Sequence, residues 1–278
     1  MITFVSAFYV LDSKFTKEKY EKWFSNFLPN IKKFKMVIFC NNESYIFLKK
    51  YINDNIILVI YEMKDFYNYK YKDKWIKNHK KNTLLNTDDK NIHGMKSHKT
   101  SWKLNMLWSE KISFVKKAYN DKYFPETEWY GWCDIGYFRG TSYGDISHGQ
   151  IKEWPNYNKI EQLDKEKVYY AMVRFDKNYI NNLFKLVNTK NKNGLPRQPI
   201  PEDQWSIAGG FFVTCKKNID WWFDMYDKKL TLYFDNNYLV KDDQIIIVDN
   251  IFSEISKFCL ISETHRCDPW FVFQRFLL

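Results

Sequence analysis

The 278-residue sequence lacks several motifs that mark common nucleotide- and metal-binding proteins. It has no GxxxxGK[ST] phosphate loop and no GxGxxG dinucleotide fingerprint, so P-loop and dinucleotide-dependent chemistries are set aside. Its five cysteines include no CxxC pair, which argues against a structural zinc site. Free and mostly buried thiols in a reducing compartment fit this wide spacing best.

Long apolar runs are also missing. No stretch approaches the roughly 20 apolar residues that a helix needs to cross a bilayer. The opening run, MITFVSAFYVLD, lacks the basic region and the small-residue cleavage site of a signal peptide. We therefore expect a cytoplasmic protein with no transmembrane segment. The bias toward Asn, Lys and Ile suits an AT-rich bacterium or a cell infected by a large virus.

Positive charge exceeds negative charge, with 43 Lys and Arg against 33 Asp and Glu and a net charge of +10. Such a field attracts anions, including phosphates, membranes and nucleic acids. The lysines are scattered among Asn, Ile and Tyr, without the regular basic and aromatic pattern of a nucleic-acid groove. We expect a solvated lysine-rich surface and no nucleic-acid partner. A basic nucleic-acid-binding protein remains an alternative.

The first part of the chain alternates apolar strand-like runs with helical patterns. The predicted elements are a strand at 3–10, a helix at 14–30, a strand at 35–41, a helix at 43–52 and a strand at 55–63. This β-α-β-α-β order implies a parallel sheet with right-handed crossovers. Ligands of such sheets bind beyond the carboxyl ends of the strands, so residues near Ala7, Asn41 and Glu62 are expected to face a site.

The rest of the chain continues the mixed pattern. Residues 64–98 are polar and lack clear periodicity, which suggests a mobile flap or an insertion. A helix is predicted over 99–120, and the strand in WYGWCDIGYF carries Asp134 at its end. Later elements are strands at 168–175 and 205–215, helices at 218–234 and from 242 onward, and a strand from 258 that leads into a polar turn. The expected fold class is α/β, with a mixed, mostly parallel sheet flanked by helices.

Three acid-bearing segments stand where a predicted element begins or ends. Asp134 has apolar residues on both sides, and burying an ionised carboxylate alone is very costly. Asp134 must therefore be neutralised, paired or bound to a metal. Glu202 and Asp203 in PED are also typical of a turn. Asp242 and Asp243, which precede an apolar run, are also typical of a helix N-terminus.

The order of these features is similar to that of GT-A glycosyltransferases. More narrowly, the chain resembles the bacterial HtrL/YibB family and related viral proteins. The segments that carry the resemblance are KTSWKLNMLWSEKISFVKKA, WYGWCDIGYFR, IAGGFFVT and DDQIIIVDN. The resemblance implies a single GT-A-like (Rossmann-like) domain over 1–278. Residues 1–140 would form its nucleotide-sugar-binding half, and residues 141–278 its acceptor-binding half.

The resemblance also implies a divalent cation. In GT-A enzymes an Asp-x-Asp motif ends a central strand and holds a cation on the donor diphosphate. Here Asp134-Ile135-Gly136 takes that place, and Gly136 replaces the second acid. His265 stands where such enzymes often have a C-terminal histidine ligand. The expected cofactor is Mn²⁺ or Mg²⁺, held by Asp134 and His265 with water and phosphate oxygens.

Further residue roles follow from the same resemblance. The donor nucleotide is expected at Ser6, Ala7, Phe8, Lys99, Asp134, Gly136 and Arg139. The acceptor is expected at Gly209, Gly210, Phe211 and Asp242. The glycine pair would let a substrate approach the backbone, although a β-bulge explains it equally well. Asp243 is the expected base for the acceptor hydroxyl if the reaction inverts the anomeric centre. If the reaction retains configuration, Asp243 would instead position the acceptor or stabilise the developing cation. Asp203 is a second catalytic acid.

These features predict a glycosyltransferase with a nucleotide-diphosphate donor, a UDP-sugar by preference, and a glycan, protein-linked or other hydroxyl acceptor. A cation at the leaving diphosphate would stabilise the negative charge that develops as the glycosidic bond breaks. The alternative is a non-catalytic carbohydrate-binding protein of the same fold. The missing second acid and the 11 tryptophans keep that alternative open.

Overall fold

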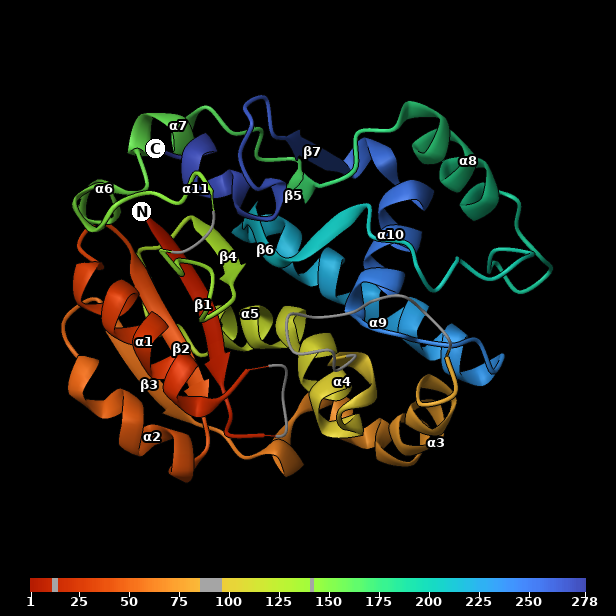
Figure 1. Ribbon diagram of the computed structural model, residues 1–278, viewed down its shortest axis with the longest axis horizontal. Coiled ribbons are helices and arrows are strands. Elements are labelled where there is room, and N and C mark those ends of the chain that lie inside the picture. Colours follow the sequence, from red (N-terminus) through yellow and green to blue (C-terminus); the bar gives the residue numbers. More distant parts are fainter. Residues whose placement is uncertain (12–14, 86–96, 141–142) are drawn as a thin grey trace.

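The computed structural model describes residues 1–11, 15–85, 97–140 and 143–278 (Figure 1). The strands of these residues form one seven-stranded sheet of order β3-β2-β1-β4-β6-β5-β7. They are β1 Ile2–Phe8, β2 Lys35–Cys40, β3 Ile56–Ile60, β4 Trp129–Cys133, β5 Val168–Met172, β6 Ile207–Cys215 and β7 Phe258–Ser262. Strands β1, β2 and β3 are neighbours in chain order. Strand β4 then pairs with the opposite side of β1.

Most strand pairings in the sheet are parallel. The pairs β1–β2, β2–β3, β1–β4 and β5–β7 run parallel, whereas β6 runs antiparallel to both β4 and β5. The carboxyl ends of β1 and β4 therefore meet at one edge of the sheet, where β6 begins. The predicted α/β fold, with a mixed and mostly parallel sheet flanked by helices, is confirmed. Residues 1–140 and 141–278 both contribute strands to the same sheet. The division into a nucleotide-sugar-binding half and an acceptor-binding half stays a prediction.

Helices cover both faces of the sheet (Figure 1). Buried residues of α1 Lys17–Phe27, α2 Asn42–Leu48, α6 His148–Glu153, α7 Tyr157–Glu161 and α11 Val272–Phe276 belong to one core. Those of α3 Lys72–Asn82, α4 Trp102–Ser109, α5 Lys111–Asn120, α8 Lys177–Asn188, α9 Ile219–Asp235 and α10 Asp243–Ser253 belong to the other. Strand β1 serves both cores, because Phe4 points to the first and Val5 to the second.

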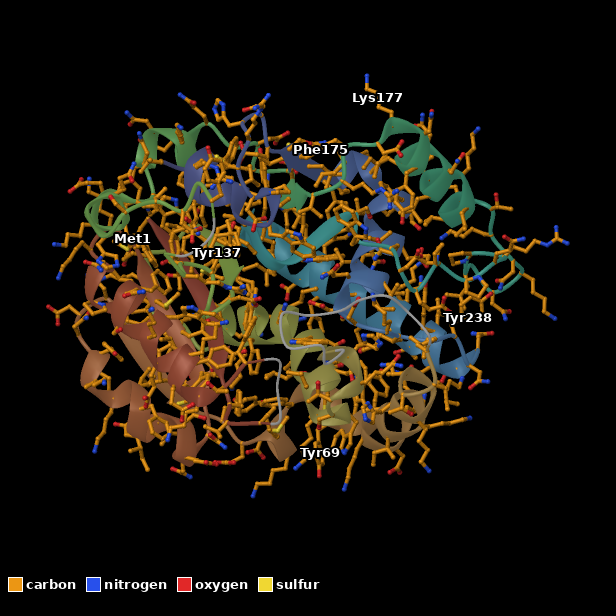
Figure 2. All side chains as sticks on the ribbon, in the orientation of Figure 1. Met1, Tyr69, Tyr137, Phe175, Lys177 and Tyr238 are labelled. Atoms are coloured by element: carbon orange, nitrogen blue, oxygen red, sulfur yellow. The ribbon has the colours of Figure 1, made fainter. Side chains whose placement is uncertain are left out.

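Aromatic rings fill much of the first core. The Phe4 ring stacks on Trp154 with centroids 5.1 Å apart and meets Phe34 edge-on at 5.3 Å. Tyr137 lies inside the molecule, whereas Phe175 and Lys177 lie at the surface where α8 begins (Figure 2). Of the five free cysteines three are buried and two are partly buried, as the sequence predicted. None of the described helices is both long enough and apolar enough to span a bilayer.

The predicted helix over 99–120 is divided at Glu110, where α4 ends and α5 begins. The Glu110 side chain is buried and accepts hydrogen bonds from the backbone N–H groups of Tyr67 (2.7 Å) and Asn68 (2.9 Å). Burial raises the pKa of Glu110 to about 8, against the opposing effect of these hydrogen bonds. The break therefore lies where a buried acid binds a distant segment of the backbone.

Residues 64–85, part of the segment expected to be a mobile flap or an insertion, contain regular structure that its sequence pattern did not reveal. That part contains α3 and short 3₁₀ turns, and the Trp75 side chain is fully buried. The Asn78 side chain accepts from the Val240 N–H (2.9 Å) and donates to the Val240 carbonyl (2.7 Å). These partners are remote in sequence, so the local pattern does not reveal them. Residues 86–96 lie outside the described residues.

Gly131 in β4 provides a test of the central packing. A Cβ atom at this position would lie 2.2 Å from the Phe212 carbonyl oxygen and 3.0 Å from the Phe4 ring. We expect Gly131→Ala to lower the free energy of unfolding by at least the ~1–3 kcal/mol typical of overpacking, measured by urea denaturation. The control is Gly149→Ala in α6, where a Cβ would meet only the Ser147 hydroxyl, at 3.8 Å. Equal stabilities of the two variants would contradict this packing.

Candidate functional site

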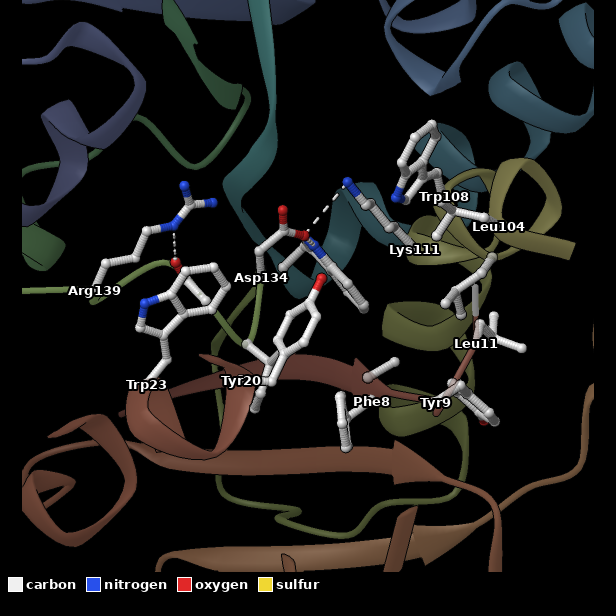
Figure 3. A pocket seen from close by; sticks show the side chains of 15 residues that line it. Phe8, Tyr9, Leu11, Tyr20, Trp23, Leu104, Trp108, Lys111, Asp134 and Arg139 are labelled. Carbon is white, nitrogen blue, oxygen red and sulfur yellow. Dashed lines mark hydrogen bonds and ion pairs between the residues drawn. The ribbon is translucent and has the colours of Figure 1, made fainter. Parts of the chain in front are cut away.

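A pocket opens at the carboxyl ends of β1 and β4 (Figure 3). This position is the topological switch point of the sheet, where open α/β folds bind ligands. Its lining comes from both faces of the sheet and consists of Ala7, Phe8, Tyr9, Leu11, Tyr20, Trp23, Leu104, Leu107, Trp108, Lys111, Trp132, Asp134, Ile135, Gly136 and Arg139. The pocket thus combines aromatic walls with one carboxylate and two cationic side chains.

Asp134 follows β4 and faces this pocket. Its backbone N–H donates to the Gly210 carbonyl (2.9 Å), which extends the β4–β6 pairing by one residue. Its carboxylate accepts from the Trp132 indole N–H (2.6 Å) and lies 3.4 Å from the Lys111 ammonium. The side chain is 40% exposed. Of the three ways to keep an acid among apolar neighbours, the structure shows pairing, together with partial exposure.

Lys111, the first residue of α5, is the cation that pairs with this acid. Its Nζ donates to the Gly209 carbonyl oxygen (2.8 Å) and lies 3.0 Å from Asp243 Oδ2. Only 10% of the side chain is exposed. Burial alone would lower the pKa of Lys111, but the attraction of Asp134 and Asp243 outweighs it and the pKa is raised. Lys111 is therefore a permanent positive charge between two carboxylates. Figure 3 shows its ion pair with one of them, Asp134.

Lys111 is not among the residues that the sequence predicted for the site. A signal for it exists, because Leu104, Trp108, Lys111 and Val115 recur at intervals of three and four residues. They follow one apolar helical face, on which Lys111 is the one charged member. A lysine at such a position has a buried ammonium that requires an acidic partner.

Asp243 is the first residue of α10, and Asp242 caps this helix by accepting from the Gln244 N–H (3.1 Å). The sequence pattern is also typical of a helix N-terminus at this acid pair, and that interpretation is confirmed for Asp242. Asp243 is buried, and burial raises its pKa to about 6 although the Lys111 ammonium opposes this shift. Asp243 does not line the main pocket but stands behind Lys111.

The glycine pair at the start of β6 makes room for both acids. A Cβ atom on Gly209 would lie 2.8 Å from Asp243 Oδ2, and one on Gly210 would lie 3.1 Å from Asp134 Oδ2. The missing side chains thus let two carboxylates approach the strand. Whether an acceptor also contacts the glycines stays a prediction.

Arg139 lies on the other side of Asp134 (Figure 3). Its guanidinium stacks over the Trp23 ring at 4.7 Å, and its Nε donates to the Gly136 carbonyl (2.7 Å). A Cβ on Gly136 would lie 2.7 Å from the Trp23 ring. A side chain therefore has no room at Gly136, the position at which the resemblance would place a second acid, because the Trp23 indole fills the space.

Of the other residues predicted to bind the donor, some line the pocket and some do not. Ala7 and Phe8 line the pocket, whereas Ser6 is fully buried in β1 and does not. Lys99 donates to the backbone carbonyl of Leu85 and is not among the residues that line the pocket.

Three further predicted residues do not line the pocket. Asp203 is exposed in a turn before β6. Phe211 is fully buried in the aromatic core, so its ring offers no surface to a ligand. His265 is exposed in the turn after β7, and its backbone N–H donates to the Glu263 carboxylate (2.9 Å).

Asn41 and Glu62 also do not line the pocket that they were expected to face. The Asn41 side chain caps α2 by accepting from the Ser44 N–H (2.9 Å). The Glu62 carboxylate accepts from the side chain of Asn42 (3.3 Å). Both residues thus stabilise the ends of outer elements.

The side chains present do not fit the predicted Mn²⁺ or Mg²⁺ site. Within the described residues, no three His, Cys, Asp or Glu side chains are grouped so that they could hold a metal ion. Asp134 has a lysine ammonium at 3.4 Å, which would repel a divalent cation. Asp243 is also paired to that ammonium.

The raised pKa of Asp243 predicts a specific pH dependence. The folded protein holds this proton up to about pH 6, whereas the unfolded chain releases it near pH 3.8. The protonated group therefore stabilises the fold fully below pH 3.8, and this contribution is lost as the pH rises to about 6. An asparagine side chain does not titrate, so the free energy of unfolding of Asp243→Asn should increase relative to that of the wild type as the pH rises from 3.8 to about 6. Urea denaturation at each pH measures this difference.

The control for this pH series is Asp224→Asn, which alters an exposed acid on α9. Its difference from the wild type should stay nearly constant over the same interval. A reversed trend for Asp243→Asn would show that the ion pair with Lys111 outweighs the effect of burial.

No protein-family model matches the sequence, and no curated protein matches it. The solved structures that resemble the fold include the following two, both at low identity. One is a 4-diphosphocytidyl-2C-methyl-D-erythritol synthase from Anaerococcus prevotii, 9% identical with a TM-score of 0.41 over 95% of this chain and 89% of that chain. The other is a glycosyltransferase involved in the glycosylation of the major capsid of PBCV-1, 13% identical with a TM-score of 0.39 over 94% of this chain and 81% of that chain. Likeness at this level carries no argument about activity.

Proposed function

We propose that this protein is a glycosyltransferase that uses a nucleoside-diphosphate sugar, as the resemblance of its sequence to GT-A enzymes and the HtrL/YibB family implies. The observation that carries the proposal is the convergence of Asp134, Lys111 and Arg139 in the pocket between the ends of β1 and β4. Open α/β sheets bind nucleotides at this position. The pocket provides positive charge for phosphates and a carboxylate for hydroxyl groups.

The aromatic walls of the pocket suit a nucleoside. Tyr20 and Trp108 line it and are partly exposed, and aromatic rings stack on bases and sugar faces. Ala7 has a small side chain at the end of β1, which leaves room beside the main chain. We place the nucleoside here, with a UDP-sugar as the favoured donor.

The diphosphate of the donor would lie between the two cations. As the glycosidic bond breaks, its electron pair leaves with the diphosphate oxygen, whose negative charge grows. Lys111 and Arg139 are already held in place, so they would stabilise this charge more in the transition state than in the ground state. Asp134, whose carboxylate is 40% exposed, is the acid that would accept hydrogen bonds from donor hydroxyls.

Asp243 takes a supporting part in this proposal. It is buried behind Lys111 and so does not touch the pocket in which the donor would lie. Its carboxylate, 3.0 Å from the ammonium, orients Lys111. The sequence-based assignment of Asp243 as the acceptor base would require the carboxylate to be accessible to the acceptor.

A non-catalytic carbohydrate-binding protein of the same fold is the second candidate. The observation in its favour is that the predicted base is buried and ion-paired. Such a protein would bind a nucleotide sugar or glycan and leave the donor intact. Nucleotide binding without donor hydrolysis or sugar transfer would therefore favour this candidate.

A thermal-shift panel with UDP, GDP, TDP and CMP tests the proposed donor class. A nucleotide at about 100 times its Kd stabilises a protein by about 2.7 kcal/mol, so the midpoint should rise by several degrees. We expect a shift with one diphosphate and release of the same nucleotide from its sugar donor. Asp134→Asn should lower donor turnover about 100-fold or more, as the loss of one preorganised polar contact does in other enzymes.

The matched control for this panel is Asp224→Asn, a change at an exposed acid on α9. It should keep both the thermal shift and the turnover of the wild type. The proposal is wrong if no nucleotide shifts the midpoint, or if Asp134→Asn turns over donor at the wild-type rate.

A further inference from the structure

Three oxygen atoms from distant segments surround the Lys111 ammonium. They are the Gly209 carbonyl at 2.8 Å, Asp243 Oδ2 at 3.0 Å and Asp134 Oδ1 at 3.4 Å. Two carboxylates and a carbonyl are also the ligands that a hard divalent cation prefers. The cage therefore has the chemistry of a metal site, but its centre is taken by a side chain of the protein.

We infer that Lys111 supplies from within the chain the positive charge that a divalent cation would supply to the donor diphosphate, so that the donor binds without a metal ion. This inference rests on the proposed function, because it names the phosphate-binding charge of that site. It replaces the predicted Mn²⁺ or Mg²⁺ ion with a residue.

The residues on the side of Asp134 away from Lys111 also support the replacement of a metal ion by Lys111. The space for a side chain at Gly136 is filled by the Trp23 ring, so a second metal-binding acid has no room there. The guanidinium of Arg139 stacks on the same ring. Asp134 thus lies between two built-in cations, and a divalent ion beside it would meet two like charges.

The geometry also leaves a path from Lys111 to a phosphate. Its contact with Asp134 is the longest of the three, and Asp134 is the partly exposed member of the cage. Lys111 itself lines the pocket. A phosphate oxygen could therefore share the Asp134 side of the ammonium, while Gly209 and Asp243 keep it in place.

Calorimetric titration of the wild type tests this inference directly. UDP, GDP, TDP and inorganic pyrophosphate are each titrated in EDTA and in Mn²⁺, and pyrophosphate removes any dependence on the base. We expect each probe that binds to have the same affinity in both conditions, within about threefold. A tenfold or larger gain with Mn²⁺ overturns the inference.

Lys111→Ala provides a second test, because it empties the cage. Asp134, Asp243 and the Gly209 carbonyl are then free to hold a divalent ion. We expect Mn²⁺ alone to raise the thermal midpoint of this variant by several degrees but not that of the wild type. Nucleotide affinity in EDTA should fall at least tenfold and recover in part with Mn²⁺.

The matched control is Lys116→Ala, on the same helix, whose ammonium pairs with the exposed Asp220 (3.1 Å). It should behave as the wild type in every arm. If Lys111→Ala does not fold, Lys111→Gln keeps a donor for the Gly209 carbonyl and carries the EDTA measurement.

The outcomes separate this inference from the proposed function. If no probe binds the wild type in either condition, the proposed function fails. The response of Lys111→Ala to Mn²⁺ alone still reports whether Lys111 occupies a cation position. If Mn²⁺ stabilises that variant no more than the wild type, or if the variant binds nucleotide in EDTA as tightly, the inference is wrong.

Discussion

The candidate site depends on one ammonium group, that of Lys111, shared by Asp134 and Asp243. Burying any one of these charges alone would cost several kcal/mol, and each is tolerated because the others are present. The three residues come from the end of β4 and the starts of α5 and α10, which are distant in sequence. The ion pairs of Lys111 with Asp134 and Asp243 thus fix where these two helices begin relative to the central strand.

Strand β6 completes this arrangement through its reversed direction. Because it runs antiparallel to β4, its first residues lie at the edge where β4 ends. The Gly209 carbonyl binds the ammonium, and the missing side chains of Gly209 and Gly210 let the two acids approach. One short segment therefore supplies a ligand to the cation and space to its counter-ions, while the pocket beside it stays open to a substrate.

The sequence predicted those helices and strands whose buried side chains recur at regular helical or strand spacing. The apolar runs of β1 to β3 and the helices between them are found where the sequence places them. Asp134 stands at the end of β4, as the break in that apolar run indicated. The errors lie where the partner is remote, because Asn78 is held by the Val240 backbone and Glu110 by the turn at Tyr67. No pattern near Asn78 or Glu110 reports such a contact.

The sequence by itself determined the α/β architecture, the edge of the sheet that carries the pocket and the acid at the centre of that edge. These follow from chain order and from side-chain periodicity, which are local properties. Only the tertiary structure decided that Lys111 is the partner of Asp134, that Asp243 is buried behind it and that Trp23 occupies the space beside Gly136. Those outcomes depend on which distant groups share a low-dielectric interior, and a charge is stabilised there only by neighbours that folding brings to it.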